Sequence, residues 1–295
     1  MHTLSTIKLF LLGAIWGSSF LFMRTATPEF GVYALVEVRT VLATLFLLPF
    51  VVLAKQWRDA IQHWRDIAFV GLVNTAIPFC LFNYSSLHLE AGYNSILNAT
   101  APMFGALIAF AWLSERLSRS AFIGLCIGFS GVIQISWAKL TFGDVGLLPI
   151  ATALAATFCY GLSASYMKRR MQGVKPLAVA AGSQLFASLF LLPIAIFTWP
   201  ETSISVNAWS QALALALLCT GVAYILYFDL IATIGPSKAI TVAYLVPLFG
   251  VIWGAIFLTE RLSFSVYVGG LCILIGVALT NGLWDRLRHH SKTTY

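Results

Sequence analysis

The sequence contains two copies of one segment, 145 residues apart. Residues 102–118 and 247–263 both begin with Pro-x-Phe-Gly and both end with Glu-Arg-Leu-Ser, and they align without a gap. Matching glycines continue at the same spacing beyond the segment, as at Gly124 and Gly269. A repeat of this length is too long for a solenoid unit. The chain is therefore predicted to consist of two related halves.

Composition places these halves in a membrane. Hydrophobic residues make up 59% of the chain and charged residues 10%, whereas a soluble domain averages about 25% charged residues. A bilayer-spanning helix needs about 20 apolar residues, and segments near this length occur ten times. This pattern predicts an all-α integral membrane protein with ten transmembrane helices, near 7–27, 33–54, 67–88, 93–113, 120–138, 146–167, 177–198, 208–229, 236–258 and 265–284.

The basic residues predict how the chain is oriented. With the N-terminus in the cytoplasm, fourteen lysines and arginines lie inside and three outside, which is the bias of proteins inserted in a cell (inner) membrane. Both termini are then cytoplasmic. The net charge of +7 is read as an orientation signal, so no nucleic-acid partner is expected. The domains are a first repeat at 5–138, a second at 146–284 and a cytoplasmic basic tail at 285–295.

Five spans in each half make the two halves enter the membrane in opposite directions. Inverted-topology repeats place a substrate site near the bilayer midplane, between the halves, and allow the two to exchange conformations. This architecture favours a secondary transporter over an enzyme or a receptor.

Several motifs resemble those of a known family. The first span, Ala14–Phe20, resembles the opening signature of the EamA branch of the drug/metabolite transporter superfamily, and Arg39 resembles the arginine of its second span. The repeated Pro and Glu-Arg-Leu-Ser pattern resembles the end of each EamA repeat. The resemblance implies ten helices around a central cavity, and export or exchange of amino acids, metabolites or drugs without ATP. In the signature of that family Asn is more usual at the place of Ser19.

Two groups of residues are candidates for transport. Pro102 and Pro247 lie near mid-membrane, where proline opens a helix, so they are either gating breaks, which we favour, or static kinks. Amides within spans either line the cavity or join helices as packing contacts. Any single aromatic residue can instead face lipid. The predicted substrate cavity is lined by Trp16, Ser19, Phe79, Asn83, Asn98, Tyr160, Tyr224, Tyr244 and Trp253.

Charged residues within spans are few. Glu37 and His88 are candidates for proton coupling because both titrate near the predicted outer boundary. Arg39 is expected to have a structural role, capping carbonyls or pairing with a carboxylate on another span. The repeated Glu-Arg pairs are expected to close helix ends, with a latch to another loop as the alternative.

The partners and the competing functions follow from these features. A small-molecule substrate and the lipid bilayer are the expected partners, with no cofactor and no metal, in a monomer or homodimer. The first hypothesis is an exporter of amino acids, metabolites or drugs; an importer or exchanger of similar solutes is the alternative. A non-transporting membrane sensor or scaffold is the hypothesis from a different functional class. Because the sequence carries no H-E-x-x-H, G-x-S-x-G or Walker motif, no enzymatic activity is expected.

Overall fold

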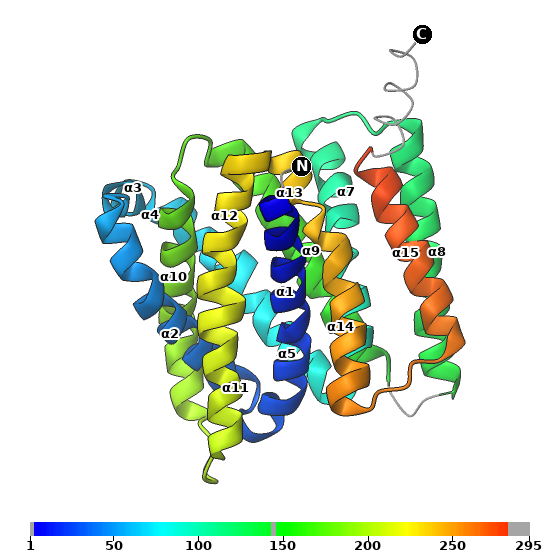
Figure 1. Cartoon of the computed structure of the whole chain (residues 1–295), viewed down its shortest axis with the longest axis horizontal. Helices are drawn as coiled ribbons and strands as arrows, with labels where there is room; N and C mark the ends of the chain where they lie inside the picture. Colours follow the sequence, from blue (N-terminus) through cyan, green and yellow to red (C-terminus); the bar gives the residue numbers. More distant parts are fainter. Residues whose placement is uncertain (1–2, 143–145, 283–295) are drawn as a thin grey trace.

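The computed structural model describes residues 3–142 and 146–282, and within these residues the chain forms helices and no strand (Figure 1). The predicted basic tail at 285–295 lies outside the described residues. The elements are α1 (Thr3–Phe30), α2 (Val32–Leu53), α3 (Trp57–Gln62), α4 (Trp64–Val70), η1 (Gly71–Ala76), α5 (Ile77–His88), α6 (Ala91–Asn98), α7 (Ala101–Leu113), α8 (Arg119–Phe142), α9 (Leu147–Arg170), α10 (Pro176–Phe197), α11 (Val206–Ala216), η2 (Leu217–Val222), α12 (Ala223–Ile234), α13 (Pro236–Ala239), α14 (Val242–Leu258) and α15 (Phe264–Thr280).

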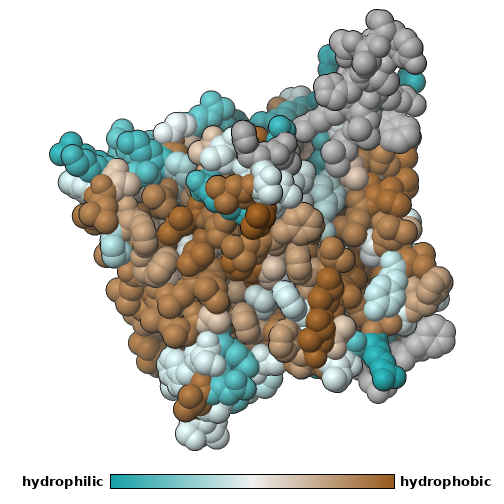
Figure 2. All heavy atoms as spheres, viewed as in Figure 1, coloured by the Kyte–Doolittle hydropathy of each residue, from teal (hydrophilic) through white to brown (hydrophobic). Residues whose placement is uncertain are grey.

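The surface of this bundle is suited to a membrane. Eight of the helical segments are long and apolar enough to cross a bilayer, and two further apolar helices, α14 and α15, are shorter. Large apolar side chains point outward from several helices, among them Leu45, Phe122 and Ile133. Figure 2 shows the apolar surface as a broad belt between two polar ends. With no water to satisfy its backbone in such a belt, a chain must pair its polar groups internally, as helices do.

The core of the bundle lies between the two halves of the chain. The most extensive packing joins α8 to α15, α1 to α14, α2 to α10, and both α5 and α7 to α9. Each of these pairs takes one helix from each half. A cavity within this core is therefore lined by both copies of the repeat.

Glycines allow the tightest of these contacts, between α8 and α15. A Cβ atom on Gly276 would lie 2.6 Å from the carbonyl oxygen of Gly124 and from the Cα atom of Gly128. Small residues let membrane helices approach at backbone distance. These glycines therefore serve a contact between helices within the chain.

Helix interruptions fall at related places in the two halves. The π-helical segments η1 and η2 lie in corresponding spans, and π-bulges occur often at functional sites. In the first half, α6 ends at Asn98 and α7 begins at Ala101. In the second half the interruption at Ile240–Thr241 comes earlier relative to the repeat. The two halves therefore differ in conformation near the middle of the bundle.

Candidate functional site

A cavity of about 570 Å³ lies between the halves, within the range of small-molecule sites. Its lining runs from Phe20 and Met23 of α1 to Lys168 near the end of α9 and Ile240 just after α13. Helix α13 lies at the end of the bundle that carries the N-terminus (Figure 1). There it reaches the surface, because Ala164, Lys168 and Ile240 line it and are also exposed. Its walls come from α1, α2, η1, α5, α6, α7, α9, η2, α12 and α14.

Most of the predicted cavity residues line this space. The matching positions Trp16 and Tyr160, one from each repeat, both face it. The interruption before α7 places Pro102 in the first turn of that helix. Backbone N–H groups in a first turn have no partner within the helix, so the N–H that proline lacks costs no hydrogen bond there. The predicted residues found in the wall are Trp16, Ser19, Phe79, Asn98, Tyr160, Tyr224, Pro102 and Arg39.

Three predicted cavity residues instead bind other parts of the bundle. Asn83 is buried, and its Nδ2 donates to the carbonyl oxygen of Val32 at 3.1 Å. The indole Nε1 of Trp253 donates to the carbonyl oxygen of Ala14 at 3.0 Å. Tyr244 accepts a hydrogen bond from Asn281 at 3.0 Å. The amide and indole groups thus join helices, which is the alternative that the sequence left open for the amides.

The remaining predicted residues lie away from the cavity. Pro247 is buried inside α14, which continues through it, and the interruption comes six residues earlier at Thr241. Glu37 is buried against α10, where its Oε1 accepts from Ser188 Oγ at 2.7 Å. His88 is exposed at the end of α5. The gating and coupling roles of these residues stay predictions.

Arg39 lies in the cavity wall, and only 6% of its surface is exposed. Its Nε donates to Thr220 Oγ1 at 2.9 Å, and its guanidinium carbon lies 3.8 Å from the centroid of the Phe79 ring. Among the described residues it has no carboxylate within ion-pair distance. A hydroxyl and an aromatic ring therefore hold it, in place of the expected carbonyls or carboxylate.

Aromatic residues close the inner end of the cavity. Phe20 and Met23 line its floor and are buried. The ring of Phe20 meets Phe82 edge-on at 5.6 Å, and Phe82 stacks on Tyr160 at 6.1 Å. These contacts separate the cavity from the opposite end of the bundle.

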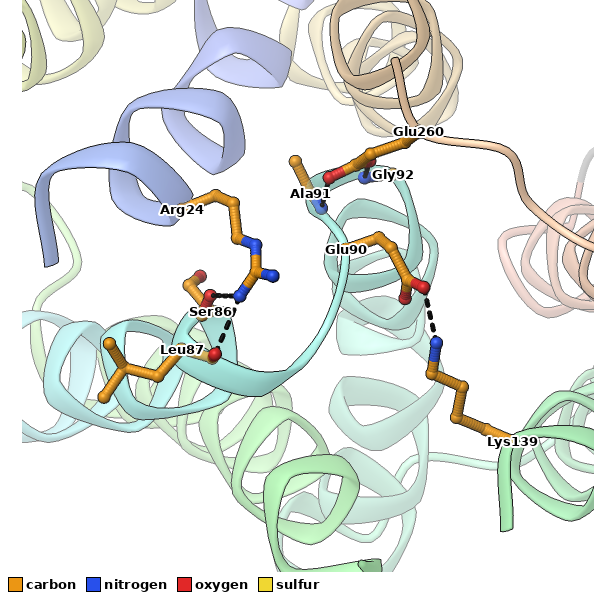
Figure 3. Close-up of polar contacts among 8 residues, drawn as sticks. All are labelled: Arg24, Ser86, Leu87, Glu90, Ala91, Gly92, Lys139 and Glu260. Carbon is orange, nitrogen blue, oxygen red and sulfur yellow. Dashed lines mark hydrogen bonds and ion pairs between the residues drawn. The ribbon is translucent and has the colours of Figure 1, made fainter. Parts of the chain in front are cut away.

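Polar contacts close that opposite end (Figure 3). The carboxylate of Glu260, from the second Glu-Arg-Leu-Ser copy, accepts from the backbone N–H groups of Ala91 at 2.7 Å and Gly92 at 3.0 Å. These are the first N–H groups of α6, which have no partner within the helix. The backbone N–H of Glu260 also donates to the carbonyl oxygen of Gly254 at 3.1 Å and closes its own helix end. The residue therefore fills both expected roles, the helix end through its backbone and the latch through its carboxylate.

Arg24 and Glu90 extend this closure. Arg24 Nη1 donates to the carbonyl oxygens of Ser86 and Leu87, both at 2.7 Å, and so ties the end of α1 to the end of α5 (Figure 3). Glu90 pairs with Lys139 of α8. The α5–α6 turn is therefore held from three sides: by α1, by α8 and by the segment after α14.

Sequence reasoning missed two contributors to the site. Thr220 was not singled out, although it lies in η2 at the place that Asn74 occupies in η1, and both line the cavity. At the 145-residue spacing of the repeat, Thr220 matches Thr75, which is buried and is not part of the cavity lining, so the repeat alone did not point to Thr220. Lys168 was read only as an orientation signal, yet it lines the cavity mouth and pairs with Glu115 at 2.6 Å. Within residues 3–142 and 146–282, no group of three or more His, Cys, Asp or Glu is placed to hold a metal.

Similar proteins agree with this architecture. The uncharacterized transporter YvbV of Bacillus subtilis (strain 168) is 27% identical over 95% of this chain and 92% of its own. A probable terminal-alkyne amino-acid exporter of Streptantibioticus cattleyicolor is 26% identical over 90% of this chain and 89% of its own. One solved crystal structure, 15% identical, shares the fold with a TM-score of 0.67 over 97% of this chain and 99% of that one.

The family match covers both repeats. Residues 4–137 and 147–282 each match the EamA-like transporter family. The chain therefore belongs to the EamA-like transporter family and is a multi-pass membrane transporter of the drug/metabolite transporter type.

Proposed function

We propose that the protein is a secondary transporter of the cell (inner) membrane that exports small organic solutes by alternating access through the central cavity. The observation that carries this proposal is the cavity itself, which is open at one end of the bundle and closed at the other by Phe82, Arg24 and Glu260. A carrier must present its site to one side at a time.

The proposal includes ten transmembrane helices arranged as two inverted five-helix repeats, at 5–138 and 146–284. Two observations support the inversion. Glu115 pairs with Lys168 at the end of the bundle where the cavity opens, whereas its copy Glu260 binds Ala91 at the closed end. Helices of one half also pack chiefly on helices of the other.

The difference between the halves supports alternating access. The two halves are interrupted at different places, Ala99–Thr100 and Ile240–Thr241. If the halves exchange conformations, the second adopts the break of the first and the cavity opens at the other end. With both termini cytoplasmic, the open end faces the cytoplasm, where an exporter loads its solute.

The substrate class is proposed from the walls and from a relative. Aromatic rings with a few polar groups suit an amphipathic organic solute of modest size, and one relative is named as a probable amino-acid exporter. An importer or exchanger of similar solutes uses the same cavity, so direction is a matter for measurement. A non-transporting sensor has no use for a cavity built symmetrically from two repeats.

Reconstituted protein tests this proposal through counterflow in proteoliposomes. We expect saturable movement of at least one labelled amino acid or related metabolite. Trp16→Ala and Asn98→Ala should each reduce it by about tenfold or more, because a lost contact of 1.4 kcal/mol changes an equilibrium constant tenfold.

Trp137→Ala is the matched control, because Trp137 is 70% exposed on the outer face of α8 and should leave transport unchanged. Equal effects at Trp137 and Trp16 would contradict a substrate site in the cavity. Absence of saturable flux across the solute panel, from folded protein, would count against transport.

A further inference from the structure

From the charges that line the cavity we propose that the transported solute is an organic anion whose carboxylate binds Arg39. This inference rests on the proposed transport function and narrows its substrate class.

The lining residues carry positive charge and no negative charge. Arg39 and Lys168 are the two cations among the described residues of the wall, and neither Asp nor Glu is found there. Lys168 at the mouth is paired with Glu115, so the uncompensated positive charge of the wall is that of Arg39. A cleft lined by one sign of charge with low-dielectric walls concentrates ligands of the opposite sign. The cavity is thus electrostatically suited to anions and unsuited to cationic drugs.

Arg39 itself lacks a counter-charge. The nearest acidic residue along its helix, Glu37, is engaged by Ser188 of α10 instead. The described hydrogen bond of the guanidinium is the one that Nε donates to Thr220 Oγ1. Both terminal nitrogens, Nη1 and Nη2, are left without a described acceptor in a residue that is 6% exposed. An unpaired buried cation is strongly unfavourable, and within a membrane it marks a functional site with a missing partner.

The contacts of Arg39 hold it ready for such a partner. Stacking on Phe79 fixes the plane of the guanidinium, and the bond to Thr220 fixes its rotation. A planar guanidinium with two free nitrogens on one edge matches a carboxylate in a bidentate arrangement. Asn74 and Tyr224 line the same cavity and add polar contacts, while Trp16 and Tyr160 offer rings to an apolar body.

Three probes that share a phenylalkyl group and differ in their charged groups test whether a carboxylate binds Arg39. Purified wild-type protein is heated with 3-phenylpropionate, phenylalanine or phenethylamine, which carry a carboxylate, both charges, or only an ammonium group. The acids should raise the melting temperature in a saturable way, and phenethylamine should not. Equal or stronger stabilisation by the amine would overturn the assignment, as would no stabilisation by either acid.

Variants of Arg39 then locate the contact. For the acid that binds, Arg39→Gln should raise the half-saturating concentration about a hundredfold, since charge-assisted bidentate contacts are among the strongest hydrogen bonds. Arg39→Lys should recover part of the affinity, because it keeps the charge and loses the fork. Arg119→Gln, at an exposed position, is the control. An unchanged affinity in Arg39→Gln that remains folded would overturn the proposal.

The two proposals fail separately. Saturable counterflow of phenethylamine without counterflow of the acids would support the transport function and contradict the proposal that the substrate is an anion. Binding of the acids through Arg39 without any counterflow would support the anion site and contradict the proposed transport function.

Discussion

Replacing Glu260 by alanine is expected to open the closed end of the bundle. The carboxylate accepts two backbone hydrogen bonds, from Ala91 and Gly92, and hydrogen bonds to charged groups contribute about 1.5–3 kcal/mol each. Water replaces part of this bonding when the end opens, so we take the net loss as equal to one such bond. That loss should raise the population open at that end by about tenfold to a hundredfold. The rate at which an impermeant thiol reagent, added from that end, modifies Met23→Cys on the cavity floor measures this population.

Two variants make the result specific to the latch. Glu260→Gln keeps one acceptor oxygen and should give an intermediate rate. Glu201→Ala removes an exposed carboxylate from the α10–α11 connection and should leave the rate at the wild-type value. Equal rates in wild type and Glu260→Ala would show that Glu260 does not hold this end closed.

A valine at Gly276 is expected to unfold or severely destabilise the protein. Its Cβ would fall 2.6 Å from three backbone atoms, of Gly124 and Gly128, so α8 and α15 would have to separate. Overpacking a core typically costs about 1–3 kcal/mol, and backbone neighbours cannot yield as side chains do. We expect a loss of about 3 kcal/mol or more, seen as a large fall in melting temperature and in the yield of monodisperse protein.

Gly270→Ala is the matched control in the same helix. There the added Cβ would meet only side-chain atoms of Ile96, at 3.3 Å and beyond, and a flexible side chain can shift. This variant should keep a melting temperature near that of the wild type. Similar stability of Gly276→Val and Gly270→Ala would mean that α8 and α15 do not pack at backbone distance.

The helical membrane fold was predictable because its signals are local or repeated. Segment length and apolar composition are sufficient to identify bilayer-spanning helices, and the duplicated Glu-Arg-Leu-Ser motif reveals the two halves directly. The position of a helix break is less local. Pro102 lies beside a break, but α14 continues through Pro247, because membrane helices tolerate proline where neighbouring groups satisfy the freed backbone.

The cavity wall was predictable in part, from the repeat and from the family resemblance. The paired positions Trp16 and Tyr160 both line it. Asn83, an amide, and Trp253, an aromatic residue, instead bind backbone carbonyls elsewhere, since the sequence does not say which face of a span turns inward. The environment of Arg39 was hidden for another reason: its contact Thr220 lies 181 residues away.

Accessibility of one cavity position from the two sides of the membrane tests the central claim most directly. In a cysteine-free protein, Ala101→Cys places a thiol in the cavity wall beside the break before α7. An impermeant reagent should label it from the side that carries the N-terminus, and labelling from the other side should appear when Glu260→Ala is added. Equal labelling from both sides without that change, or labelling only from the side of Glu260, would contradict a carrier whose single central site is open at one end.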